Sequence, residues 1–83
     1  MCYVYVLRIK KSGRYYIGQT QDLTKRLEKH SLGKTKSMKN RGEFDVVYVE
    51  KCSSRADAMR REKQIKRYKG GDAFKRLLAD FAS

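Results

Sequence analysis

A short segment, RYYIGQTQDLTKRLEKH (14–30), crowds together tyrosine, arginine and histidine. Tyrosine and histidine can exchange protons, and the arginine guanidinium binds phosphate oxygens in a forked geometry. The candidates are Tyr16, Arg26 and His30, with Tyr5 from the preceding segment. Each has an ordinary alternative, since strand tyrosines usually pack in a sheet, a lone arginine usually lies on the surface, and a histidine at a helix end can interact with the helix dipole. Packing alone explains the tyrosines but not the whole combination.

A single carboxylate stands out in the second half of the chain. Within 54–69, helical spacing predicts an apolar face made of Ala58, Met59 and Ile65, and Glu62 falls in its angular middle. A carboxylate on such a face must be paired, protonated or bound to a cation, because an isolated buried charge is very costly. The spacing alone leaves a salt bridge and a functional role equally open.

The elements that must position these residues begin with a predicted hairpin. The β-branched and aromatic segment 3–9 predicts a strand, Gly13 marks a turn, and 15–18 predicts the return strand. Such a hairpin brings Tyr5 and Tyr16 close in space, although they are far apart in sequence.

The segment 22–30 predicts a helix with Asp22 as its N-cap. At about 100° per residue, His30 and two leucines share one side of this helix, and Arg26 falls at the edge of that side. We therefore expect His30 and Arg26 to face inward or along a rim.

The rest of the chain predicts a third strand at 44–51, a helix at 54–69 opened by an S-x-x-D capping pattern, and a last helix at 72–82. The order is β-β-α-β-α-α, with a first connection too short for a parallel crossover. It predicts one small α+β domain over 1–83, in which helices flank a mostly antiparallel three-stranded sheet.

The charge balance favours a polyanionic partner. The 83 residues include 21 Lys and Arg against 9 Asp and Glu, a net charge of +12, so nucleic acid is the leading candidate over a merely solvated basic surface. Six residues are the expected phosphate contacts, four in the basic segment 33–42 and two beside Glu62: Lys34, Lys36, Lys39, Arg41, Arg61 and Lys66.

Two function classes lack sequence support. No apolar run approaches the roughly 20 residues that span a bilayer, and the N-terminal charges are reversed relative to a signal peptide. Cys2 and Cys52 are too few for a disulfide framework and match no zinc motif. We expect a cytoplasmic protein with reduced cysteines and no membrane association.

Three motifs together resemble the GIY-YIG nuclease family. YVY (3–5), ten residues, then YIG (16–18) resembles the family signature. DLTKRLEKH (22–30) is similar to the helix carrying the family's arginine and, in one branch, a histidine one turn later. ADAMRREKQIK (56–66) is similar to the helix carrying its glutamate. The resemblance covers nearly the whole chain and is closest to the small stand-alone GIY-YIG proteins of bacteria.

The resemblance implies a role for each residue. Tyr5 and Tyr16 correspond to the signature tyrosines, Arg26 to the catalytic arginine, His30 to an accessory site residue and Glu62 to the ligand of Mg²⁺ or Mn²⁺. Such a hard cation keeps most of its waters and needs only one or two carboxylates. Of the two tyrosines, we prefer Tyr5 as the general base, with Tyr16 positioning water or phosphate.

Three departures from the family pattern concern substrate choice. Tyr3 replaces the first glycine of the signature, and Gln19 stands where some relatives have lysine. The asparagine and proline found beyond the glutamate helix in many of the family's DNA-repair endonucleases are absent as well.

The function these features imply is a metal-dependent endonuclease acting on DNA. The alternative is a nucleic-acid-binding module of the same fold without cleavage, and a more distant one is an RNA-processing nuclease. Most enzymes of the family carry a separate DNA-binding domain, for which 83 residues leave no room. We therefore expect non-specific binding, a preference for branched, flapped or nicked DNA, or a protein partner that supplies specificity.

Overall fold

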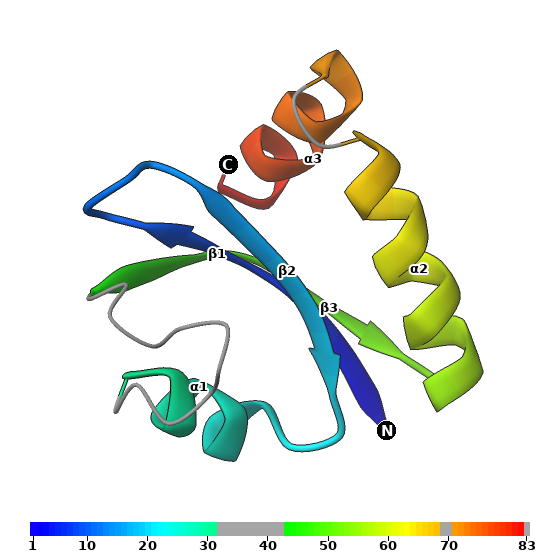
Figure 1. The fold of residues 1–83 in the computed structure, drawn as a ribbon. Helices are drawn as coiled ribbons and strands as arrows, with labels where there is room; N and C mark the ends of the chain where they lie inside the picture. The colour runs from blue at the N-terminus through cyan, green and yellow to red at the C-terminus, as the bar shows by residue number, and fades with distance from the viewer. Residues whose placement is uncertain (32–42, 69–70, 83) are drawn as a thin grey trace.

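The structure is a computed structural model that describes residues 1–31, 43–68 and 71–82 (Figure 1). Its elements follow the predicted order: β1 (Cys2–Ile9), β2 (Tyr15–Thr20), α1 (Leu23–Ser31), β3 (Phe44–Cys52), α2 (Arg55–Tyr68) and α3 (Asp72–Ala82). The predicted α+β class is therefore confirmed, with element ends that shift by at most two residues.

The sheet has the order β2-β1-β3, and both strand pairs are antiparallel. The turn between β1 and β2 contains Gly13 at φ +73°, a conformation that favours glycine. In the resulting register, Tyr5 lies opposite Gly18 and Leu7 lies opposite Tyr16. The predicted proximity of the two signature tyrosines is thus confirmed by the hairpin.

Helices cover both faces of the sheet (Figure 1). The alternating side chains of β1 divide between them, so Val4 and Val6 pack with α2 and α3, while Tyr5 and Leu7 pack with α1. Because β1 is the central strand, its side chains are almost all buried. The face covered by α1 is the one that holds Tyr5 and Tyr16.

Both predicted helix caps are present. The backbone N–H of Lys25 donates to a carboxylate oxygen of Asp22 at 3.0 Å, and the backbone N–H of Asp57 donates to the Ser54 hydroxyl at 3.2 Å. These contacts satisfy N–H groups that have no partner within the first turn of a helix. They fix where α1 and α2 begin, and hence where Arg26 and Glu62 are carried.

The prediction of the apolar face of α2 was partly wrong. Ala58 and Ile65 are completely buried, but Met59 is 43% exposed. The buried side of α2 extends toward half-buried Arg61 instead, so the helix is rotated relative to the prediction. Glu62 consequently lies at the flank of the buried face, with a side chain that is 20% exposed.

Both cysteines are free and buried in the core. Among the residues described, no helix is long and apolar enough to cross a membrane.

Candidate active site

The centre of the candidate site is a buried pair of titratable side chains. The hydroxyl of Tyr5, on the central strand, lies 3.0 Å from Nε2 of His30, at the end of α1. Each side chain is 1% exposed. Burial, and then the positive charge of Arg26, lowers the pKa of His30 below its ordinary 6.5, so the imidazole is neutral at neutral pH.

Tyr16 completes an aromatic cluster around this pair. Its ring centroid lies 6.3 Å from that of Tyr5 and 5.3 Å from that of His30. Unlike Tyr5, Tyr16 is only half-buried, because it belongs to the edge strand β2. One tyrosine is therefore enclosed and the other borders solvent.

Gly18 makes room for the Tyr5 ring. A Cβ atom at this position would lie 2.6 Å from the Tyr5 hydroxyl oxygen and 2.8 Å from its Cζ atom, closer than real side chains approach one another. The absence of a side chain on β2 therefore allows the ring to lie against the neighbouring strand. The signature glycine serves the position of the tyrosine as well as the strand.

Two opposite charges act on the Tyr5 hydroxyl. Burial contributes most to raising the pKa of Tyr5 well above its ordinary value of 10.0, and Tyr16 and the negative charge of Glu62 raise it further, while the positive charge of Arg26 lowers it. Arg26 comes from α1 and Glu62 from α2, which packs against β1 and β2. The fold thus brings both charges, from helices on different faces of the sheet, within electrostatic range of one hydroxyl.

The donor set around Glu62 restricts what metal site the protein can build. Its carboxylate lies 3.6 Å from the exposed Lys66 ammonium. No group of three or more histidine, cysteine, aspartate or glutamate side chains able to hold a metal occurs among the described residues. A protein cage for zinc or calcium is thus not supported there, whereas one carboxylate fits Mg²⁺ or Mn²⁺ held mainly by water.

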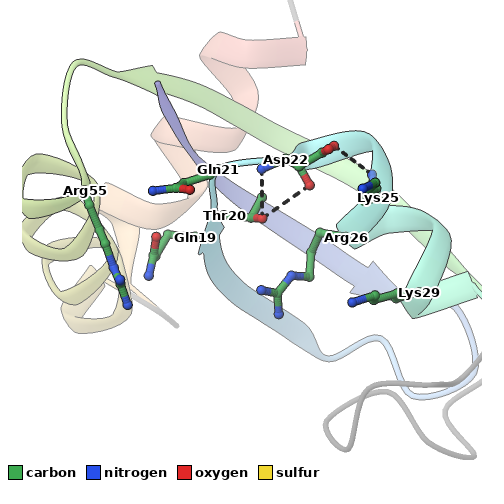
Figure 2. A pocket seen from close by; sticks show the side chains of 8 residues that line it. All are labelled: Gln19, Thr20, Gln21, Asp22, Lys25, Arg26, Lys29 and Arg55. Carbon is green, nitrogen blue, oxygen red and sulfur yellow. Dashed lines mark hydrogen bonds between the residues drawn. The ribbon is translucent and has the colours of Figure 1, made fainter.

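An open pocket of about 350 Å³ borders Arg26. Figure 2 shows Arg55, from the start of α2, on one side, Arg26 and Lys29 on the other, and Gln19 and Gln21 between them. Among the described residues, the lining has four basic side chains and one acidic one: Gln19, Thr20, Gln21, Asp22, Lys25, Arg26, Lys29 and Arg55. The pocket is therefore strongly electropositive.

The predicted phosphate contacts are placed only in part. Nε of Arg61 donates to both carboxylate oxygens of Glu50, at 3.0 and 3.1 Å, and a second guanidinium nitrogen donates to Gln64 at 2.9 Å, so Arg61 ties α2 to β3. Lys66 is exposed and pairs with Glu62. The four others, Lys34, Lys36, Lys39 and Arg41, lie outside the described residues. A role in DNA binding stays a prediction for all six.

The sequence analysis did not single out Arg55, which lines the pocket. Arg55 and Glu62 are seven residues apart and so occupy the same flank of α2. That spacing was an available signal. The pocket itself depends on how β2, α1 and α2 meet, which no local pattern encodes.

A tyrosine pair beside an arginine on the following helix and a glutamate on a later one, set on a β2-β1-β3 sheet, is the arrangement expected of a GIY-YIG nuclease domain. The family model for the GIY-YIG catalytic domain matches residues 1–73. The chain therefore belongs to the GIY-YIG family, and the resemblance inferred from its motifs is confirmed.

The relatives are small bacterial proteins. The chain is 42% identical over 65 residues to UPF0213 protein OB0043 of Oceanobacillus iheyensis, covering 77% of this chain and 74% of that one. It is 39% identical over 67 residues to UPF0213 protein SH2523 of Staphylococcus haemolyticus, covering 80% of each. The solution NMR structure of UPF0213 protein BH0048 from Bacillus halodurans matches with a TM-score of 0.50 and 34% identity, over 89% of this chain and 92% of that one.

Proposed function

We propose that this protein is a divalent-metal-dependent endonuclease that hydrolyses phosphodiester bonds in DNA. The most direct support is that Arg26 and Glu62, which carry opposite charges, both act electrostatically on the Tyr5 hydroxyl. The chain also belongs to a nuclease family. A binding module needs a basic surface, but it has no need for a buried tyrosine–histidine pair whose tyrosine lies within electrostatic range of an arginine and a glutamate.

Each polar group has a role in this reaction. Arg26 binds non-bridging oxygens of the scissile phosphate and stabilises the charge that develops on them. Glu62 is the protein ligand of Mg²⁺ or Mn²⁺, and the bound ion supplies Lewis-acid stabilisation of the phosphate and an acidified water. His30 holds the Tyr5 hydroxyl in place through their hydrogen bond.

The structure argues for Tyr16 as the proton acceptor, in place of the Tyr5 preferred from sequence. A buried phenol whose pKa is raised keeps its proton, which suits Tyr5 to donating a hydrogen bond rather than accepting a proton. Tyr16 borders solvent, where an attacking water can reach it.

The proposed substrate is recognised mainly through its phosphates. The net charge of +12 favours sequence-independent binding, and we propose nicked, flapped or branched DNA, as arises during DNA repair, as the preferred structures. A protein partner that supplies specificity is compatible with this scheme. Since the relatives are bacterial and both cysteines are free, we propose the bacterial cytoplasm as the site of action.

The test is nicking of supercoiled plasmid with Mg²⁺ or Mn²⁺, comparing the parent protein with Glu62→Ala and Lys66→Ala. Both variants break the same surface ion pair, but only Glu62→Ala removes the proposed ligand. We expect nicking by the parent and by Lys66→Ala, and none by Glu62→Ala. A parent protein that binds plasmid yet never nicks it with either metal would establish the binding-module alternative.

A further inference from the structure

We propose that the pocket beside Arg26 binds, through Lys29 and Arg55, a second backbone phosphate of the DNA strand being cut. This inference rests on the proposed nuclease function and adds a strand-holding site to it. The pocket phosphate lies close to the scissile one on the same strand, and the pocket sets how the strand approaches Arg26.

The charge around the pocket calls for an anionic ligand. Within the part of the chain that the structure describes, no ion pair engages Arg26, Lys29 or Arg55. The single lining carboxylate, Asp22, accepts the backbone N–H of Lys25 as a helix cap. Basic side chains that converge on one cavity without internal neutralisation repel each other, and a phosphate relieves that repulsion.

The pocket also offers neutral donors suited to phosphate. Figure 2 shows the side chains of Gln19 and Gln21 between Arg55 and Arg26. Amide N–H groups are common donors to phosphate oxygens in DNA complexes. Thr20, in contrast, is occupied, because its hydroxyl contacts the backbone of Asp22 at 3.2 and 3.3 Å. The donors therefore come from the end of β2 and the residue that follows it, while the charges come from α1 and α2.

The spacing along α2 separates this site from the metal ligand. Arg55 and Glu62 share a flank of the helix, and at 1.5 Å per residue their Cα atoms lie about 10 Å apart along its axis. Phosphates of one strand rise only about 3.4 Å each along the axis of duplex DNA, so two sites about 10 Å apart are close enough to contact nearby phosphates of one strand. Arg26 borders both sites, since it lines the pocket and acts on the Tyr5 hydroxyl.

The binding test compares Arg55→Gln with Arg76→Gln. Arg76 is an exposed arginine of α3 outside the pocket lining, so both variants lose one positive charge. Affinity for a short flapped duplex is measured in chelator across a range of salt concentrations. For Arg55→Gln we expect a salt slope lower by about 0.9 and an affinity reduced by roughly fivefold to tenfold at 0.1 M salt. Equal behaviour of the two variants would overturn the pocket.

A positional test uses the same duplex with one phosphate at a time replaced by an uncharged methylphosphonate. We expect one replacement near the junction to weaken binding by the parent and to have no further effect on Arg55→Gln. Additive losses at every position would contradict the assignment. If the parent protein shows this coupling but never cuts DNA, the pocket assignment stands and the nuclease proposal is refuted. If the parent protein cuts DNA without this coupling, the nuclease proposal stands and the pocket assignment is refuted.

Discussion

The Tyr5 hydroxyl and Nε2 of His30 lie 3.0 Å apart inside the protein, where water does not compete for either atom. The first signature tyrosine and the histidine of α1 therefore form one structural unit that joins the central strand to the helix carrying Arg26. Tyr16 lies beside this unit at the edge of the sheet. The Tyr5 hydroxyl thus stabilises the fold through a buried hydrogen bond, whereas Tyr16 is only partly buried.

Replacing each tyrosine by phenylalanine should separate their roles. Tyr5→Phe removes a buried partner of His30 and should lower the free energy of unfolding by about 1–3 kcal/mol. Tyr16→Phe should cost about 1 kcal/mol or less, because a half-exposed hydroxyl can be replaced by water. Both variants should lose roughly two orders of magnitude in nicking rate. Thermal unfolding and plasmid nicking provide the measurements, and full activity in both variants would assign the tyrosines to packing alone.

Gly18→Ala should disturb the site through the Tyr5 ring. The new methyl group would overlap the buried phenol, and such overpacking typically costs about 1–3 kcal/mol. A matched control is Gly71→Ala, where the contact that a new Cβ makes with the described residues is with the carbonyl oxygen of Tyr68, at 3.3 Å. We expect Gly18→Ala to lower the thermal midpoint and the nicking rate together, with Gly71→Ala close to the parent. A Gly18→Ala protein with parental activity would show that the ring can move without consequence.

His30 should make the fold less stable in mild acid. Its pKa in the folded protein is below the ordinary 6.5, so as pH falls through about 6.5 the unfolded chain takes up a proton that the folded protein does not. The free energy of unfolding is therefore highest above pH 6.5. It falls progressively as the pH drops from 6.5 toward the lower pKa that His30 has in the folded protein. His30→Gln removes this titration, so its thermal midpoint should fall less between pH 7.5 and 5.5. Parallel curves for parent and variant would contradict the assignment.

Glu62→Gln should abolish cutting without unfolding the protein. The ion pair with Lys66 is a surface pair, worth about 1 kcal/mol or less, so its loss should affect stability little. Removing a negative charge near the proposed phosphate path should leave DNA affinity in chelator equal or higher. The measurements are thermal unfolding, affinity and nicking on one preparation.

Lys66→Gln is the control for the ion pair. It breaks the same contact but keeps the carboxylate, so it should still nick plasmid, with a rate reduced only by the loss of one predicted phosphate contact. If Glu62→Gln unfolds early, or if it nicks DNA as well as the control does, the carboxylate is structural and the metal-ligand assignment is refuted.

The secondary structure was predictable because local signals and tertiary packing agree. The S-x-x-D cap before α2, the turn glycine between β1 and β2, and the β-branched run of β1 each specify their element from neighbouring residues. The tyrosine pair was predictable for the same reason, since a tight hairpin fixes which residues are opposite one another.

Features set by contacts between distant segments were not predictable. The rotation of α2 depends on the bond between Arg61 and Glu50 of β3, and helical periodicity alone cannot detect a polar anchor on a buried face. The burial of Tyr5 against His30 depends on where α1 docks on the sheet. Sequence spacing identified the residue types of the site, but it could not tell which tyrosine is enclosed.

The central position of β1 has a consequence for motion. With hydrogen-bonded strands on both sides and helices over both faces, β1 can exchange its amide protons only when the sheet opens, so its protection against hydrogen exchange should approach that of global unfolding. Tyr5 is therefore a fixed reference point within the site. Adjustment to a DNA strand is expected from the edge strand and the helices, which carry Tyr16, Arg26 and Glu62, rather than from the central strand that carries Tyr5.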